Sequence, residues 1–135
     1  MNFVTNKRIR FSHCDPAGIV FYPRYAELCN EVVEDWFREA LDVDFHTFHE
    51  KLRLGLPVVR STIEYLATST YGDDLTFSLQ VKALGNSSMT LFITASSNAQ
   101  ERIRAELKVV MMSMDSMRAV AISDEWRDKF SLFQD

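Results

Sequence analysis

The sequence has few of the residues that interrupt regular structure or cross-link it. It contains four glycines and three prolines among 135 residues, and no Pro/Gly/Ser-rich stretch that would mark a linker. Its two cysteines are too few for the disulfide framework of a small secreted protein or for a cysteine-rich zinc site. We therefore expect residues 1–135 to form a single domain, with Cys14 and Cys29 as free thiols in the cytoplasm.

Long apolar runs and excess positive charge are also absent. No stretch approaches the roughly 18 apolar residues of a membrane span, and the N-terminal MNFVTNKRIRF is charged where a signal peptide is apolar. The chain has 15 Lys and Arg against 19 Asp and Glu, a formal net charge of −4. Neutralising nucleic-acid phosphates needs clustered positive charge. We expect neither a membrane nor a nucleic acid as a partner.

One long segment has the apolar period of a helix. From Pro23 to Leu41, apolar or small residues recur three and four positions apart, which predicts a helix with one buried face. Pro23 suits the first helical turn, where a missing N–H costs nothing. A shorter helical piece is expected over Phe45–Leu52, and a terminal helix with an N-cap signature over Ser123–Phe133.

The remaining segments are extended in pattern, and most of them alternate between apolar and polar residues. The predicted strands are Lys7–Phe11, Pro57–Tyr65, Leu75–Ala83, Met89–Ala95 and Ile103–Met111. Hairpin turns are expected at Gly85–Ser88 and Ser96–Glu101. A helix with a wide apolar stripe needs a sheet to cover it, so we predict an α+β fold with an antiparallel sheet around one long helix. An open sheet edge then predicts a dimer, most simply with a two-fold axis.

The segment between the first strand and the helix carries the clearest chemical signal. The turn D-P-A-G places Asp15 seven residues before the end of the helix at which backbone N–H groups are unpaired. An acid and an N–H donor together supply the base or nucleophile and the oxyanion site that acyl transfer needs. Because Pro23 has no N–H, the nearest donor is the backbone of Tyr22. Gly18 permits close approach of the backbone to a substrate. The alternative interpretation of Asp15 is that it is an ordinary turn residue.

The run D-P-A-G-I-V-F-Y-P-x-Y, with the long helix and four strands after it, resembles the hotdog-fold acyl-CoA thioesterases of the 4-hydroxybenzoyl-CoA thioesterase family. The resemblance covers nearly the whole chain. It implies a hotdog fold, with the active site between two subunits of a homodimer that can pair into a homotetramer. It further implies hydrolysis of an aryl or short- to medium-chain acyl-CoA. Coenzyme A is then part of the substrate, and no cofactor is expected.

The resemblance also assigns residues. Asp15 corresponds to the catalytic acid, acting as base or nucleophile, and the Tyr22 N–H to the group that polarises the thioester carbonyl. We expect His13, Gly18, Tyr25 and Asn30 to contact the acyl part of the substrate. The Asn30 amide could bond a ring hydroxyl or a carbonyl, and a plain surface asparagine is the alternative.

The coenzyme A end is less well marked. Some family members hold the phosphates with a basic cluster, whereas the corresponding turn here is neutral. The expected contacts are Arg60, Lys82, Gly85, Asn86 and Ser87, with Lys108 or residues of a partner subunit as alternatives. The turn could act through its backbone N–H groups, but a plain hairpin turn is the preferred interpretation. An acyl-carrier protein therefore remains an alternative thiol carrier. A non-hydrolytic module that binds an acyl thioester or a protein partner is the second function considered.

No metal site is expected. His46 and His49 are three residues apart but lack a convincing third ligand. The cluster Met111, Met112, Met114 and Met117 is interpreted as adaptable packing or interface filler.

Overall fold

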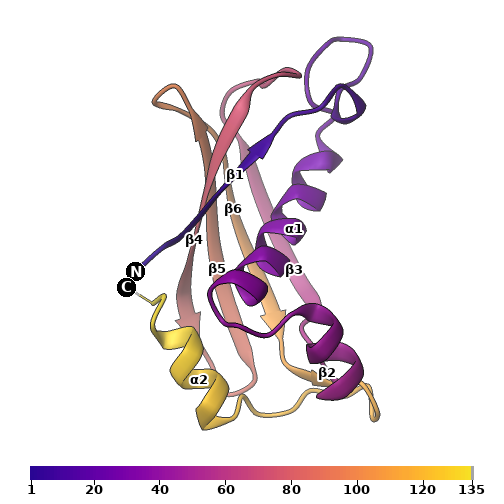
Figure 1. Ribbon diagram of the computed structural model, residues 1–135, viewed down its shortest axis with the longest axis vertical. Helices are drawn as coiled ribbons and strands as arrows, with labels where there is room; N and C mark the ends of the chain where they lie inside the picture. The colour runs from indigo at the N-terminus through magenta and orange to yellow at the C-terminus, as the bar shows by residue number, and fades with distance from the viewer. Residues whose placement is uncertain (135) are drawn as a thin grey trace.

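Five antiparallel strands curve around one long helix in the computed structural model, which describes residues 1–134 (Figure 1). The strand order is β1-β4-β5-β6-β3, and a separate two-stranded sheet pairs β2 with β7. The elements are β1 (Phe3–Arg8), η1 (Phe11–His13), α1 (Pro23–Glu39), η2 (Thr47–Lys51), β2 (Leu54–Gly55), β3 (Val58–Tyr65), β4 (Asp74–Leu84), β5 (Ser88–Ser97), β6 (Gln100–Val110), β7 (Met112–Ser113) and α2 (Asp124–Ser131).

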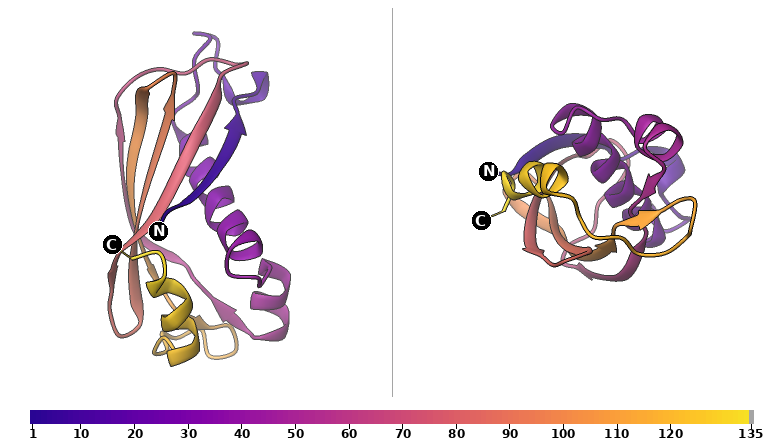
Figure 2. Two further views of the ribbon diagram at one scale, coloured as in Figure 1. Left: turned by 60° about the vertical axis from the view of Figure 1, so that its left-hand side comes forward. Right: turned by 90° about the horizontal axis from the view of Figure 1, so that it is seen from below.

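Helix α1 lies along the inner face of the sheet, and α2 covers one end of it (Figure 2). The buried residues of α1 are Tyr25, Leu28, Cys29, Val32, Val33, Trp36 and Phe37. They recur with the helical period on which the prediction depended, so the predicted helix is confirmed. It ends at Glu39, two residues earlier than predicted, and Asp42 follows with a φ of 60° that turns the chain away. The strands supply the other half of the core.

The alternation predicted for three consecutive strands is confirmed except at Ala83, which is exposed because a register shift interrupts the β4–β5 ladder between Val81 and Ala83. The residues that face α1 are all buried, namely Leu75, Phe77, Leu79 and Val81 of β4, Met89, Leu91, Ile93 and Ala95 of β5, and Ile103, Ala105, Leu107 and Val109 of β6. The opposite face carries mainly polar side chains. Between β5 and β6, Asn98 and Ala99 both have positive φ, 52° and 59°. Such a pair makes the tight two-residue turn whose twist matches antiparallel strands.

The first strand was predicted in the wrong place. Lys7–Phe11 was expected to be extended, but β1 is Phe3–Arg8 and the chain then turns into the 3-10 helix η1. Two contacts explain the difference. The backbone of Ile9 bonds to the loop before β4, and the Arg10 N–H donates to His13 Nδ1 at 2.9 Å. This side-chain acceptor replaces a ladder partner and ends the strand.

The smaller elements follow the predictions in part. Helical structure was expected over Phe45–Leu52, and η2 occupies the centre of that range as one turn with π-type bonding. The predicted terminal helix is α2, with Ser123 Oγ accepting the Trp126 N–H at 3.3 Å as an N-cap. Strands β2 and β7 were not predicted. In residues 1–134, no helix is long and apolar enough to cross a membrane.

The aromatic contacts of Phe37 predict the variant that destabilises the fold most clearly. Phe37 is fully buried and meets the rings of Trp36, Phe48 and Trp126 at centroid distances of 5.0–5.6 Å. We expect Phe37→Ala to lower the free energy of unfolding by about 3–5 kcal/mol, because it leaves a cavity. Phe11 is 77% exposed, so Phe11→Ala should stay within about 0.5 kcal/mol. Urea unfolding at matched protein concentration measures both, and equal losses would contradict the expectation.

Candidate active site

The loop before α1 is a small hairpin closed by backbone bonds. Cys14 and Val20 form an antiparallel bridge. The Asp15 N–H donates to the Ile19 carbonyl at 3.0 Å, and the Gly18 N–H donates to the Asp15 carbonyl at 2.9 Å. Gly18 has a φ of 83°, a conformation that other residues adopt at a cost. The predicted turn is confirmed, and the backbone of Gly18 explains the need for glycine there.

This hairpin leaves one oxygen of the Asp15 carboxylate available. The side chain is half-buried, and Oδ1 accepts the Ala17 N–H at 2.9 Å. Within residues 1–134, Oδ2 has no hydrogen-bond partner. The Phe21 N–H donates to the His13 carbonyl at 2.9 Å, which ties the hairpin to the start of α1. One fixed and one free carboxylate oxygen therefore lie near the N-terminal end of the helix.

Tyr22 is the N-cap residue of α1. Its backbone N–H has no acceptor within the described part of the chain, as expected for a donor at the start of a helix. The positive end of the helix dipole adds to its attraction for a negative oxygen. The Tyr22 side chain is 62% exposed and lies edge-on to the ring of Tyr65, with centroids 6.0 Å apart.

A first cavity, the helix-start cavity, lies beside Tyr22. It has a volume of about 280 Å³, and Tyr22, Tyr25 and Tyr65 are among its lining residues, with the loop after β3 on the other side. Tyr25 is almost fully buried. Burial raises the pKa of its phenol, and a hydrogen bond with Ser69 opposes part of that effect. Tyr25 therefore presents a neutral hydroxyl at this cavity.

Arg102, on β6, bonds directly to the loop after β3, and that loop holds the Asp15 hairpin beside the helix-start cavity. Its buried guanidinium donates to the Thr68 carbonyl at 2.9 Å, to Ser69 Oγ at 2.9 Å and to Asp73 Oδ2 at 3.1 Å. The same loop then holds the Asp15 hairpin, since the Ser69 carbonyl accepts the Val20 N–H. The sequence analysis missed Arg102, because its partners are about thirty residues away in the chain.

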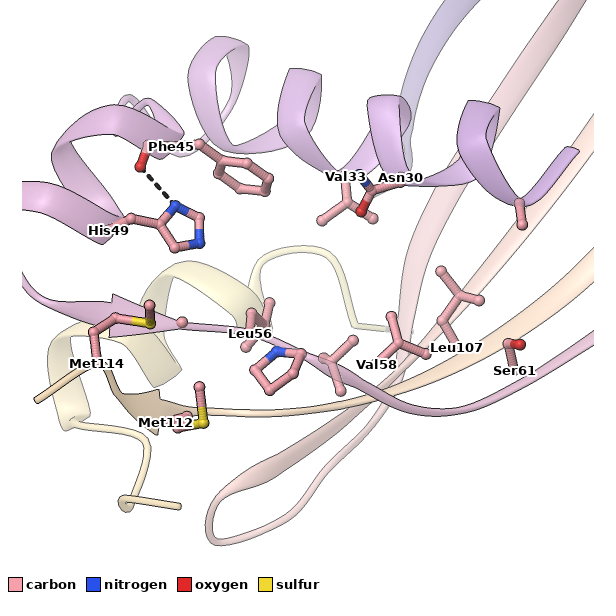
Figure 3. Close-up of a pocket in the computed structure, with 14 residues that line it drawn as sticks. Asn30, Val33, Phe45, His49, Leu56, Val58, Ser61, Leu107, Met112 and Met114 are labelled. Atoms are coloured by element: carbon pink, nitrogen blue, oxygen red, sulfur yellow. Dashed lines mark hydrogen bonds between the residues drawn. The ribbon is translucent and has the colours of Figure 1, made fainter. Parts of the chain in front are cut away.

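A second cavity, the α1–β3 cavity, opens further along the helix and has a volume of about 600 Å³ (Figure 3). Asn30 and Val33 of α1 face Val58 at the start of β3, and Met112 and Met114 close the far side. The walls are mostly apolar. Asn30 is exposed and also lines this cavity, so its position is compatible both with the predicted contact with an acyl group and with a plain surface asparagine. The methionines, interpreted from the sequence as packing, line this cavity.

His49 also lines the α1–β3 cavity. The sequence analysis considered it only as a metal ligand, and no group of three or more His, Cys, Asp or Glu that could hold a metal occurs within residues 1–134. His13 lies elsewhere. It faces a polar hollow with Arg24 and Glu27 on another side of α1, so the structure brings it to neither apolar cavity.

The residues predicted to bind coenzyme A are not gathered at one place in the protomer. Lys82 is ion-paired with Glu106 on the polar face of the sheet. Arg60 lies directly opposite Lys108 in the β3–β6 ladder.

The turn Gly85–Ser87 lies at the opposite end of the sheet from the Asp15 hairpin (Figure 1). Its Gly85 N–H is already bonded to the Ser88 carbonyl at 2.8 Å. Arg127 donates to the carbonyls of Gly85 and Asn86 at 2.8 and 3.4 Å. A cation therefore adjoins this neutral turn, which the sequence analysis did not anticipate.

Comparison with known proteins agrees with this architecture. Residues 9–130 match the Thioesterase-like superfamily. A 4-hydroxybenzoyl-CoA thioesterase from Pseudomonas sp. strain CBS-3 is 29% identical over 119 residues, which cover 87% of this chain and 82% of that protein. A 1,4-dihydroxy-2-naphthoyl-CoA hydrolase from Nostoc punctiforme is 28% identical over 85 residues, covering 63% of this chain and 57% of the relative. The chain thus matches little more than half the length of the Nostoc protein.

The crystal structure of the 4-hydroxybenzoyl CoA thioesterase from Pseudomonas sp. strain CBS-3 superimposes with a TM-score of 0.87 at 24% identity, covering 95% of this chain and 98% of that one. The sheet around α1 is therefore a hotdog fold, as predicted, and the class of protein is that of the hotdog-fold thioesterases. This chain belongs to the Thioesterase-like superfamily.

The Arg102 network predicts how the stability of the protein depends on pH. Two contacts hold the pKa of Asp73 below its usual range: the hydrogen bond from the Thr70 N–H has the larger effect, and the Arg102 guanidinium has the smaller one. Ionised Asp73 therefore stabilises the folded protein. This contribution is present above the ordinary aspartate pKa and is lost as the pH falls through the lower pKa that Asp73 has in the folded state. We expect Asp73→Asn to cost about 1–3 kcal/mol at neutral pH and much less near about pH 3.

Thermal unfolding across this pH range, at fixed protein concentration, measures the effect. Asp74→Asn is the matched control, because Asp74 pairs with Arg8 on the surface with both side chains more than 60% exposed and such pairs contribute little. A penalty for Asp73→Asn that did not shrink in acid would contradict the assigned cause.

Proposed function

We propose that the protein is a thioesterase that hydrolyses an aryl acyl-CoA, with Asp15 and the Tyr22 N–H as its reacting groups. The proposal rests on the half-buried Asp15 carboxylate, whose free Oδ2 lies in a rigid hairpin before the unpaired N–H of α1. An acid and a preorganised donor at a helix start are the two elements that acyl transfer requires. The relatives named above, which act on aryl acyl-CoA thioesters, support the same substrate class.

The chemistry can follow either of two routes. In both, the thioester oxygen accepts the Tyr22 N–H and becomes negative in the tetrahedral intermediate; such a donor contributes about 10²–10³-fold to the rate. In the first route Asp15 removes a proton from water as the water attacks the carbonyl carbon; the intermediate then collapses, the C–S bond breaks, and the thiolate leaves and takes up the proton. In the second, Oδ2 attacks that carbon and the C–S bond breaks, so that the thiolate leaves and a mixed anhydride remains. Water then hydrolyses the anhydride and regenerates the carboxylate.

A two-fold dimer through β3 would complete the site. Strand β3 is an edge of the sheet, with most of its side chains exposed, and an edge strand presents unpaired backbone groups to a partner. Antiparallel pairing of two copies would bring the Tyr65 end of one β3 beside the Val58 end of the other. The helix-start cavity of one protomer would then adjoin the α1–β3 cavity of the partner. The thioester would react at the first cavity and its acyl group would occupy the second.

For the coenzyme A phosphates we propose Arg60 together with Lys108. Their positions are directly paired in the ladder at the β3 edge, and two adjacent cations repel one another unless an anion lies between them. Lys82 is a weaker candidate because Glu106 already neutralises it. The backbone of Gly85, Asn86 and Ser87 remains a proposed contact, with Arg127 as a neighbouring cation.

Asp15→Asn tests the assigned role of the acid. It keeps the size of the side chain and an acceptor for the Ala17 N–H but removes the charge, so we expect turnover of 4-hydroxybenzoyl-CoA and related aryl thioesters to fall about 10²–10⁴-fold. Release of free thiol measures the rate. Asp128→Asn, an exposed carboxylate on α2, is the control and should be fully active. Equal hydrolysis by Asp15→Asn and the wild type would remove Asp15 from the mechanism. Thermal stabilisation of the wild type by the thioester with no thiol release would instead favour a non-hydrolytic binding module.

The β3 dimer predicts a second effect. Val59 on β3 is 57% exposed and Val4 on the opposite edge strand β1 is 56% exposed. Val59→Lys places a charge in the proposed interface, so we expect a shift to monomers on size-exclusion chromatography with light scattering, accompanied by loss of turnover. Val4→Lys should change neither. A fully active monomeric Val59→Lys protein would show that one protomer suffices.

A further inference from the structure

We propose that His49 determines the specificity of the site by accepting a hydrogen bond from a hydroxyl group on the acyl part of the substrate. The inference rests on the proposed thioesterase function and names the chemistry at the far end of the acyl group. It assigns a role to His49, which takes no part in the reaction proposed for Asp15 and the Tyr22 N–H. The preferred substrate is an aryl thioester whose ring carries a hydroxyl remote from the thioester carbon.

The tautomer of His49 follows from one hydrogen bond. Nδ1 lies 2.7 Å from the Phe45 carbonyl oxygen. A carbonyl oxygen only accepts, so Nδ1 must carry the hydrogen. In the neutral imidazole Nε2 is then an acceptor. Figure 3 shows Nε2 on the cavity side of the ring, and no group within residues 1–134 donates to it.

The ring is held in this orientation by its neighbours. Phe45 and Phe48 meet it edge-on, with centroids 5.1 and 5.4 Å away, and Phe48 is fully buried. Together with the bond to the Phe45 carbonyl, these rings restrict the rotation of the imidazole. His49 is therefore a preorganised acceptor, which binds a donor at little cost in side-chain entropy.

The surroundings of His49 make its acceptor selective. Val33, Leu56, Met112 and Met114 form apolar walls of the same cavity, and Asn30 supplies an amide further along α1 (Figure 3). An acyl group without a donor would cover Nε2 and leave it unpaired, which a site built for a hydroxyl rejects. A hydroxyl on a rigid ring satisfies both the apolar walls and the acceptor.

Binding of hydrolysis-resistant thioethers tests the inference separately from catalysis. The probes are two pairs, 4-hydroxyphenacyl-CoA with phenacyl-CoA, and the 6-hydroxy-2-naphthacyl and 2-naphthacyl thioethers of coenzyme A. Their dissociation constants for the wild type, His49→Phe and His49→Gln are measured by titration calorimetry. Gln keeps an acceptor, whereas Phe keeps the ring without one. His46→Phe is the matched control, since His46 is an exposed residue at the start of the same turn.

We expect the wild type and His46→Phe to bind the hydroxylated member of at least one pair tenfold or more tightly, as expected when a site hydrogen-bonds a substrate hydroxyl. His49→Phe should abolish this preference while binding the unsubstituted probe at least as well, and His49→Gln should retain part of it. The inference is overturned if neither pair shows a preference, or if the preference survives in His49→Phe. Turnover of the matching thioesters is measured in parallel. Its complete absence would refute the proposed hydrolysis and leave the binding result to decide the role of His49.

Discussion

The burial of one face of α1 against the sheet fixes the position of everything else at the site. Trp36 and Phe37 are fully buried on the helix, and the inner residues of β4, β5 and β6 are buried against the same core. A helix held in this way cannot slide or rotate without opening cavities in a close-packed interior. Its N-terminal end, with the unpaired Tyr22 N–H, is therefore a fixed point, and the Asp15 hairpin is bonded to the chain just before it.

A buried charge stabilises the region where apolar packing is thin. Arg102 lies near the start of β6 and donates to the loop after β3. That loop in turn holds the hairpin through Ser69 and through a 2.7 Å bond from Thr70 Oγ1 to the Gly18 carbonyl. Three acceptors surround Nη1 of Arg102, whereas its buried Nε has no hydrogen-bond partner within residues 1–134. Together with the bonds between the loop after β3 and the hairpin, these contacts hold two loops far apart in sequence against each other.

Two features of the protomer bear on how its cavities are used. Tyr22, at the start of α1, lines the helix-start cavity, whereas the larger α1–β3 cavity has mostly apolar walls with a few polar side chains, among them Asn30 and His49. These cavities lie toward the two ends of the exposed edge strand β3. Under the proposed function, this division would separate the reaction, which depends on a carboxylate and a backbone donor, from the choice of acyl group, which depends on shape and a few hydrogen bonds.

The sequence by itself determined the elements whose signals are local. The helical period of α1, the alternation of β4 to β6, and the turn containing Asp15 and Gly18 were all predictable, because each depends on neighbouring residues and their hydrogen bonds. The strand predicted at Lys7–Phe11 was wrong, and β2 and β7 were missed, because a two-residue strand has no period and pairing partners come from elsewhere in the chain. The places of Arg102 and His49 were decided only by the tertiary structure. Their partners and cavity walls are brought together by the closing of the sheet around α1, and no spacing along the chain records that contact.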